Sequence, residues 1–216
     1  MLLVRHGQST WNAAGRWQGR ADPPLTELGE LQARQAARAL GTFDLLVSSP
    51  LQRAWRTAEL IGEELGIGPV QPADDLAERE VGPWTGLTFE EIDLTWPGAL
   101  QRREWPEGFE DDDAIVERAV AAVNDLAAHH PDGTVLGVTH GGVLHALERG
   151  LGRSQGRFTN LSGFWMSVDL AVEGARITFG ERVWLSEIET GGRRSLSGLA
   201  RASSAGERDE RVTEQA

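Results

Sequence analysis

Short apolar runs alternate along the chain with longer stretches in which apolar residues recur at helical spacing. Three of the runs predict buried strands: Leu2–Arg5, Asp44–Ser49 and Thr134–Thr139. They are rich in leucine and valine and lack the alternating polar residues of a half-exposed strand, so we expect a sheet covered on both faces. Two later runs, Phe164–Leu170 and Arg176–Trp184, predict a closing hairpin around Glu173-Gly174.

Helices are predicted between these strands from capping residues, apolar periodicity and terminal glycines. The first runs from Thr26 to about Leu40 with Gly41 as its stop, and the second from Leu51 to about Leu65 with Ser49-Pro50 as cap and Gly66 as stop. A capping box at Thr88 starts a short helix that ends near Trp96-Pro97, and Asp111–His130 forms a long one. The last follows the turn His140-Gly141-Gly142 and ends at about Leu151.

This order of elements predicts an α/β fold, a three-layer α/β/α sandwich with a mostly parallel central sheet. Functional groups in such folds gather beyond the carboxyl ends of the strands. His6, the Ser48-Ser49 turn and His140 each follow a predicted strand, so we expect them to meet at one crevice. Residues 1–188 are expected to form one catalytic domain, and residues 189–216, rich in Gly, Ser, Arg and Glu, a disordered tail.

Composition narrows the classes of function. The chain has 216 residues, a formal net charge of −12 and no cysteine. Disulfides, thiolate catalysis and cysteine zinc sites are therefore excluded, and nucleic acids and anionic membranes are disfavoured as partners. No apolar run reaches the length of a membrane span. We expect a cytoplasmic enzyme that captures an anionic small molecule in a local basic pocket.

The candidate chemistry centres on Arg5-His6-Gly7 at the end of the first strand. A lone histidine there is usually satisfied by a backbone carbonyl. Its surroundings change that interpretation: the segment from Arg5 to Asn12, together with Arg16, Gln18-Gly19 and Asp22, resembles the signature of the histidine phosphatase superfamily, the phosphoglycerate mutase-like proteins. The resemblance covers roughly Leu2 to Trp184.

The resemblance implies roles for individual residues. His6 would be the nucleophile that becomes phosphohistidine, and Glu78, four residues before the glycine of the Gly82-Pro83-Trp84-Thr85-Gly86 stretch, would be the proton donor, leaving Glu80 a surface charge. His140 matches the second family histidine, and the catalytic group would also include Arg5 and Arg53. The phosphate would be held by Arg5, Asn12, Gln18, Gly19, Arg53, His140 and Gly141, with no metal and no cofactor.

Physical considerations support Arg53 independently. It falls in the first turn of a predicted helix, where the helix dipole disfavours a cation. A bound anion explains such a cation, because guanidinium offers a bidentate fork to phosphate oxygens. Arg56, three residues further, is better interpreted as a solvated surface residue.

Other residues carry less information. His129 and His130 point in different directions at a helix end, and His145 is interpreted as a packing residue. The segment Trp96–Asp113 is expected to fold over the crevice. Its aromatic residues Trp96, Trp105 and Phe109 could equally contact the substrate or anchor the segment to the core.

Three hypotheses of function follow. The leading one is a phosphomonoesterase acting on a small phosphoester. The second is a phosphoglycerate mutase, but family mutases carry a longer insertion with tyrosines between the acid and the second histidine. Here Glu78 and His140 are only 62 positions apart, tyrosine is absent and Glu104–Asp113 is acidic, although Arg102 and Arg103 leave the mutase open. The third is a non-catalytic phospho-ligand binding module. A homodimer is left open.

Overall fold

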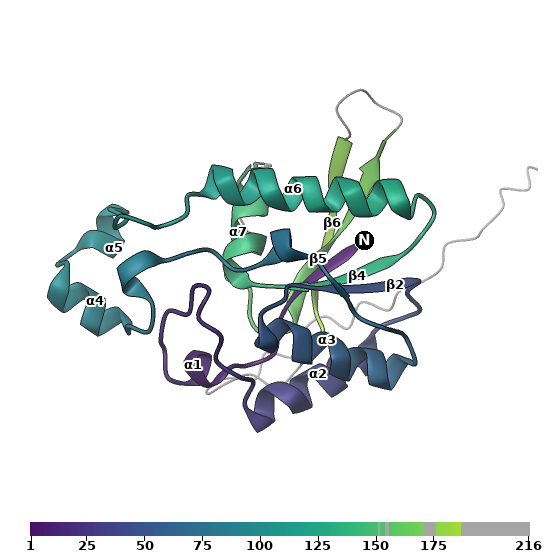
Figure 1. Cartoon of the computed structure of the whole chain (residues 1–216), viewed down its shortest axis with the longest axis horizontal. Helices are drawn as coiled ribbons and strands as arrows, with labels where there is room; N and C mark the ends of the chain where they lie inside the picture. Colours follow the sequence, from purple (N-terminus) through teal and green to yellow (C-terminus); the bar gives the residue numbers. More distant parts are fainter. Residues whose placement is uncertain (151, 154–155, 171–175, 187–216) are drawn as a thin grey trace, which may run out of the picture.

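The computed structural model describes residues 1–150, 152–153, 156–170 and 176–186 (Figure 1). Its strands are β1 Leu2–Arg5, β2 Leu45–Ser48, β3 Gln71–Pro72, β4 Val135–Thr139, β5 Ser162–Asp169 and β6 Arg176–Trp184. Its α-helices are α1 Thr10–Ala13, α2 Glu27–Ala39, α3 Gln52–Leu65, α4 Phe89–Thr95, α5 Ala99–Arg102, α6 Asp112–His129 and α7 Gly141–Gly150. Two 3₁₀ turns, η1 Asp74–Leu76 and η2 Gly82–Trp84, complete the set.

The strands form one six-stranded sheet in the order β3-β2-β4-β1-β5-β6. β1, β2, β3 and β4 run parallel, while β5 pairs antiparallel with both β1 and β6. The mostly parallel sheet and the closing hairpin are confirmed. The predicted hairpin tip at Glu173-Gly174 lies outside the described residues, as does the predicted tail from 189 onward.

Helices cover both faces of this sheet (Figure 1). In β1, Leu2 and Val4 pack into a core cluster with residues of α2 and α3, and Leu3 points the other way into a cluster with residues of α6 and α7. That alternation is what a strand buried on both faces requires. The predicted three-layer α/β/α sandwich is therefore confirmed.

The predicted cap of α3 is wrong. The helix begins at Gln52 after Leu51, which makes no side-chain cap hydrogen bond. The Ser49 hydroxyl lies 2.7 Å from Nε2 of His140, and the N–H of Gln52 is instead accepted by Asp22 Oδ1 at 2.7 Å. The carboxylate of Asp22, 30 residues upstream, therefore accepts the N–H at the start of α3, and the Ser49 hydroxyl contacts His140.

Other helix ends follow the predicted signals more closely. Thr26, Thr88 and Asp111 each accept a backbone N–H as N-cap residues. Gly66 closes α3 in the left-handed conformation with φ 69°. By contrast, α2 ends through an extended Leu40 before reaching the predicted stop at Gly41. The glycines after His140 belong to the first turn of α7 rather than to a separate turn.

The segment expected to fold over the crevice is held by an aromatic cluster. The fully buried Trp84 ring lies 5.4 Å from Trp17, 6.3 Å from Trp96 and 5.8 Å from both Trp105 and Phe109. The anchoring alternative for these aromatic residues is thus the one observed.

Within the described ranges, no helix combines the length and apolar character needed to cross a membrane.

Candidate active site

Three strand ends place polar side chains together at one edge of the sheet. β1 and β4 are paired with Arg5 opposite Thr139, so His6 and His140 emerge side by side. The His6 N–H donates to Thr139 O at 3.0 Å, and the two imidazole centroids are 5.1 Å apart. Ser49, just after β2, contacts His140. The convergence expected from the sequence is what the structure shows.

His6 is held as a neutral ring with one free nitrogen. Its Nδ1 lies 2.6 Å from the carbonyl oxygen of Gly7, and because a carbonyl only accepts, Nδ1 carries the proton. Nε2 therefore keeps its lone pair. Burial, followed by the charges of Arg53 and Arg5, lowers the pKa of His6 well below its usual value. This is the protonation state a nucleophilic imidazole needs.

The glycine after His6 is demanded by a close backbone approach. A Cβ at position 7 would lie 2.5 Å from the carbonyl oxygen of Gly29 at the start of α2. The Gly7 N–H donates to Thr57 Oγ1 of α3 at 3.0 Å. The His6 backbone is therefore fixed against both helices on one face of the sheet.

The guanidinium of Arg5 reaches the loop that precedes β5. Its Nη1 donates to the carbonyl oxygen of Phe158 at 2.8 Å. Desolvation by burial is the main cause that lowers the pKa of Arg5 to about 10, which still leaves it charged at neutral pH. Within the described part of the chain, its buried Nε has no hydrogen-bond partner. Arg5 thus presents a cation with unused donors beside His6.

Arg53 is fully buried. Its Nη1 donates to Ala21 O at 2.6 Å and its Nη2 to Gly19 O at 2.8 Å. Arg53 and Gly19, both predicted phosphate ligands, therefore contact one another. The charge of Arg53 nevertheless acts on the site, because it lowers the pKa of both His6 and His140.

Glu78 faces the start of α7. Its Oε2 accepts the Gly142 N–H at 3.2 Å, and its Oε1 accepts the Arg79 N–H at 2.7 Å. A Cβ at Gly142 would collide with the Glu78 carboxylate, so glycine is what admits the carboxylate here. Glu80 instead accepts the N–H groups of Val81 and Gly82 and has no place in the cavity wall.

His140 is buried, and one of its ring nitrogens is unused. The Ser49 hydroxyl accepts the Leu51 N–H and can donate to Nε2 of His140. With Nε2 accepting, the proton sits on Nδ1, which is buried without a partner among the described residues. Burial is the largest cause of the pKa of His140 lying well below its usual value. The ring is thus a neutral donor lacking an acceptor.

Two amides link the start and the end of the domain. Asn12 Oδ1 accepts the Ser9 N–H at 3.2 Å and Asn160 Nδ2 at 3.2 Å, which leaves its own NH₂ group for the cavity. Asn160 Nδ2 also donates to the His6 carbonyl at 2.9 Å. Gln18 is oriented by the Ser9 hydroxyl, 2.7 Å from its Oε1. Asn160 was not found by sequence reasoning.

These groups surround a cavity of about 440 Å³, a volume suited to a small metabolite. The cavity is lined by six of the predicted site residues: Arg5, His6, Asn12, Gln18, Glu78 and Gly141. The other three, His140, Arg53 and Gly19, are not among the residues that line it. The lining also includes Asn160, Arg157, Phe158, His145, Arg16, Trp11 and Trp17, which the sequence analysis did not assign to the site.

His145 packs as predicted and in addition lines the cavity. Its ring packs edge-on against Phe158, with centroids 5.0 Å apart, as a packing residue would, but it also faces the cavity. Burial lowers the pKa of His145 to about 4, so it is uncharged at neutral pH.

Comparison with known proteins bears on this geometry. The model of the histidine phosphatase superfamily (branch 1) matches residues 1–168, which is well over half of the chain. The chain belongs to the histidine phosphatase superfamily. The resemblance seen in the sequence is confirmed.

Several relatives within the superfamily are named as phosphatases. The chain is 37% identical over 192 residues to a glucosyl-3-phosphoglycerate phosphatase of Mycobacterium tuberculosis, covering 76% of this chain and 86% of the relative. It is 39% identical over 157 residues to a metal-independent phosphoserine phosphatase of Arabidopsis thaliana, covering 68% of this chain and 66% of the relative. A solved structure of a mycobacterial glucosyl-3-phosphoglycerate phosphatase with VO3 matches with a TM-score of 0.75 at 34% identity, covering 83% of this chain and 96% of that one.

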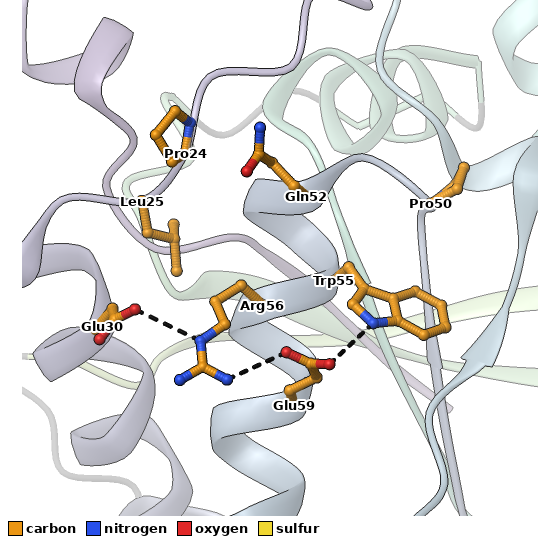
Figure 2. A pocket seen from close by; sticks show the side chains of 8 residues that line it. All are labelled: Pro24, Leu25, Glu30, Pro50, Gln52, Trp55, Arg56 and Glu59. Carbon is orange, nitrogen blue, oxygen red and sulfur yellow. Dashed lines mark hydrogen bonds and ion pairs between the residues drawn. The ribbon is translucent and has the colours of Figure 1, made fainter.

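A second hollow on this superfamily member, of about 530 Å³, lies between the start of α3 and the segment before α2 (Figure 2). Its charged residues neutralise one another: Arg56 pairs with Glu30 at 3.4 Å and with Glu59 at 3.1 Å, and Glu59 also accepts the Trp55 N–H. This hollow is larger than the cavity at His6, but its described lining contains no histidine and no arginine without a carboxylate partner. The smaller cavity is therefore the candidate active site.

Proposed function

We propose that this protein is a metal-independent phosphomonoesterase that hydrolyses a small phosphorylated metabolite through a phosphohistidine on His6, with Glu78 as general acid and base. The observation that carries the proposal is the neutral His6 imidazole, whose Nδ1 proton is bound to Gly7 O and whose Nε2 lone pair is free. It shares one cavity with the Arg5 cation and the Glu78 carboxyl group. Nucleophile, charge stabiliser and proton donor are the three parts that phosphoryl transfer needs.

In the first step, Nε2 of His6 bonds to phosphorus while the bond from phosphorus to the ester oxygen breaks. Glu78, protonated, gives its proton to that oxygen, which leaves as an alcohol. The charge that spreads over the phosphoryl oxygens is stabilised by the guanidinium groups of Arg5 and Arg53. The further phosphate ligands in this proposal are Asn12, Gln18, Gly19, His140 and Gly141.

The second step regenerates the enzyme. The Glu78 carboxylate takes a proton from water, the water oxygen bonds to phosphorus and the phosphorus–nitrogen bond breaks. Inorganic phosphate leaves, and His6 returns to its neutral form. The orphaned Nδ1 donor of His140 and the free NH₂ group of Asn12 supply acceptor-seeking groups for the phosphate oxygens during both steps.

A phosphatase is favoured over a mutase by the surroundings of the site. Arg102 and Arg103, the basic residues that kept the mutase open, are both exposed and do not line the cavity, and Arg102 pairs with Glu104 at 2.8 Å. The two relatives described above are named as a glucosyl-3-phosphoglycerate phosphatase and a phosphoserine phosphatase. We keep a cytoplasmic location and a small-molecule substrate, on grounds of charge and cysteine content, as parts of the proposal. A homodimer stays a prediction.

The proposal is tested by incubating the protein with a ³²P-labelled phosphomonoester, quenching it, and measuring the label on the chain. An acid-labile, alkali-stable adduct that disappears in His6→Ala is expected, together with release of inorganic phosphate. Turnover that persists in His6→Ala would refute the phosphohistidine. Interconversion of 2- and 3-phosphoglycerate faster than hydrolysis would make the protein a mutase, and binding without release from any ester would make it a binding module.

A further inference from the structure

One cation of the catalytic cavity has no part in the chemistry proposed above. Arg157 lines the cavity with an exposed side chain and forms no ion pair with any residue in the described ranges. Arg16, also in the lining, is occupied by Glu91 at 2.9 Å and by the carbonyl of Gly86. In the hollow of Figure 2, Arg56 is likewise neutralised by carboxylates. Among the described arginines that line the cavity, Arg157 and Arg5 are therefore the two without a carboxylate partner, in a chain of net charge −12.

The loop that carries Arg157 is held by hydrogen bonds from Arg182 to its backbone. Arg182 of β6 donates to the carbonyl of Gly156 at 3.2 Å and to that of Arg157 itself at 3.5 Å. Arg182 is in turn held by a buried ion pair with Glu148 of α7 and lies 4.0 Å from the ring centroid of Phe158. The contacts that position the loop use its backbone, so the Arg157 side chain is free to meet a ligand.

The same loop is tied to the nucleophile. Arg5 donates to the carbonyl of Phe158, and Asn160 donates to the carbonyl of His6. Arg157 therefore has a fixed position relative to His6, because the residues that follow it, Phe158 and Asn160, are bonded to Arg5 and His6. A group fixed in this way can select a substrate by the position of a second charge.

The charges in the cavity leave room for one further anion. Glu78 is the only carboxylate in the lining described, and it is committed to proton transfer. The charge of Arg157 also lowers the pKa of Arg5, so the two guanidinium groups repel one another across the cavity. A ligand with two anionic groups would relieve that repulsion and would leave neither cation unpaired.

We propose that Arg157 binds a carboxylate of the substrate, so that the enzyme acts on phosphomonoesters of hydroxy carboxylic acids. This rests on the proposed function of the site. A carboxylate presents two oxygens to the guanidinium fork and carries the single charge that one arginine balances. A second phosphate would bring about two charges. Of the other groups in the lining, His145 is neutral and Arg16 is already paired, so that second charge would find no partner.

The test compares matched substrates that differ in one group. We would measure kcat/KM for 3-phosphoglycerate against glycerol 1-phosphate and for phosphoserine against phosphoethanolamine; only the first of each pair has a carboxylate. Fructose 1,6-bisphosphate against fructose 6-phosphate tests for a second phosphate. We expect the carboxylates to be preferred by roughly tenfold or more, as a charge-assisted hydrogen bond gives.

Arg157→Gln should remove that preference by raising KM for the carboxylates roughly tenfold, with a much smaller effect on their partners, and Arg157→Lys should restore part of it. Arg153→Gln is the matched control, because Arg153 contacts Gly180 O and the Phe179 ring outside the cavity. Equal loss on both members of each pair, or preference for the bisphosphate alone, would overturn the assignment. If the wild type releases phosphate from no ester at all, the proposed function itself has failed; hydrolysis without preference fails only Arg157.

Discussion

Replacing Arg182 by leucine removes one half of a buried ion pair under the cavity. The side chains of Arg182 and Glu148 are only 6% and 4% exposed, and Nε of the arginine lies 2.8 Å from Oε1 of the glutamate. Taking away one partner leaves a desolvated charge without its counterion, which costs about 3–5 kcal/mol. Loss of the contact with the Phe158 ring adds about 1 kcal/mol, and packing of the leucine offsets part of the total.

We therefore expect the free energy of unfolding of Arg182→Leu to fall by about 3 kcal/mol. For a domain of this size, that corresponds to a drop in Tm of roughly 6–12 °C. Urea denaturation followed by tryptophan fluorescence measures the change, since the chain has 8 tryptophans. Arg34→Leu is the control: Arg34 is 38% exposed and pairs with Glu63 and Glu64 at the surface, so its loss should cost less than about 1 kcal/mol.

A double variant separates charge burial from packing. Arg182→Leu combined with Glu148→Leu removes both charges, and it should be more stable than Arg182→Leu alone by at least about 1 kcal/mol. If Arg182→Leu unfolds within about 1 kcal/mol of the wild type, or if the two substitutions are additive, the desolvated carboxylate is not the source of the cost.

Three further predictions follow from the site. The pKa values of His6, His140 and His145 are all lowered by burial, so the unfolded chain binds more protons than the folded one. The free energy of unfolding should be highest at pH 7.5 and above, and it should fall by about 1 kcal/mol per histidine as the pH is lowered from 7.5 through the ordinary histidine pKa to 6.0. Urea denaturation measures this fall, which should be shallower in His140→Asn. Gly142→Ala should displace the Glu78 carboxylate and reduce kcat roughly tenfold or more in a phosphate-release assay. Gly141→Ala should reduce kcat much less, because its Cβ would lie at an ordinary 3.6 Å from Arg5 Nε. Equal losses in the two variants would contradict this reasoning. Asn160→Asp replaces the donor to the His6 carbonyl by an acceptor and should lower both stability, by about 1–3 kcal/mol, and activity; a variant as active and as stable as the wild type would show that this hydrogen bond is dispensable.

The parts of the fold that depend on local pattern could be predicted from the sequence. The apolar run at Leu2–Arg5 and the capping threonines of α2 and α4 carry their signals within a few residues, and the structure places them as expected. The superfamily was identified for the same reason, because the segment around His6 is continuous in sequence. Short-range periodicity and motifs therefore sufficed for the architecture.

What the sequence did not reveal depends on contacts between distant segments. Ser49 looked like a helix cap, but its hydroxyl is taken by His140, 91 residues away. Asn160 and Arg157 lie in an irregular stretch before β5, where no periodicity distinguishes them from loop residues. Their significance arises only when the chain returns to lay this stretch beside His6.

The position of β1 in the sheet affects when the chain can complete its fold during synthesis. The strand that precedes His6 is synthesised well before its two neighbours, β4 and β5, which are more than 130 residues later in the chain. Until Ser162–Asp169 has left the ribosome, one side of β1 has no partner and the carbonyl of His6 lacks the Asn160 amide. Such distant pairing delays folding. A nascent chain therefore carries His6 long before it contains the strands and the Asn160 amide that fix His6 in the cavity.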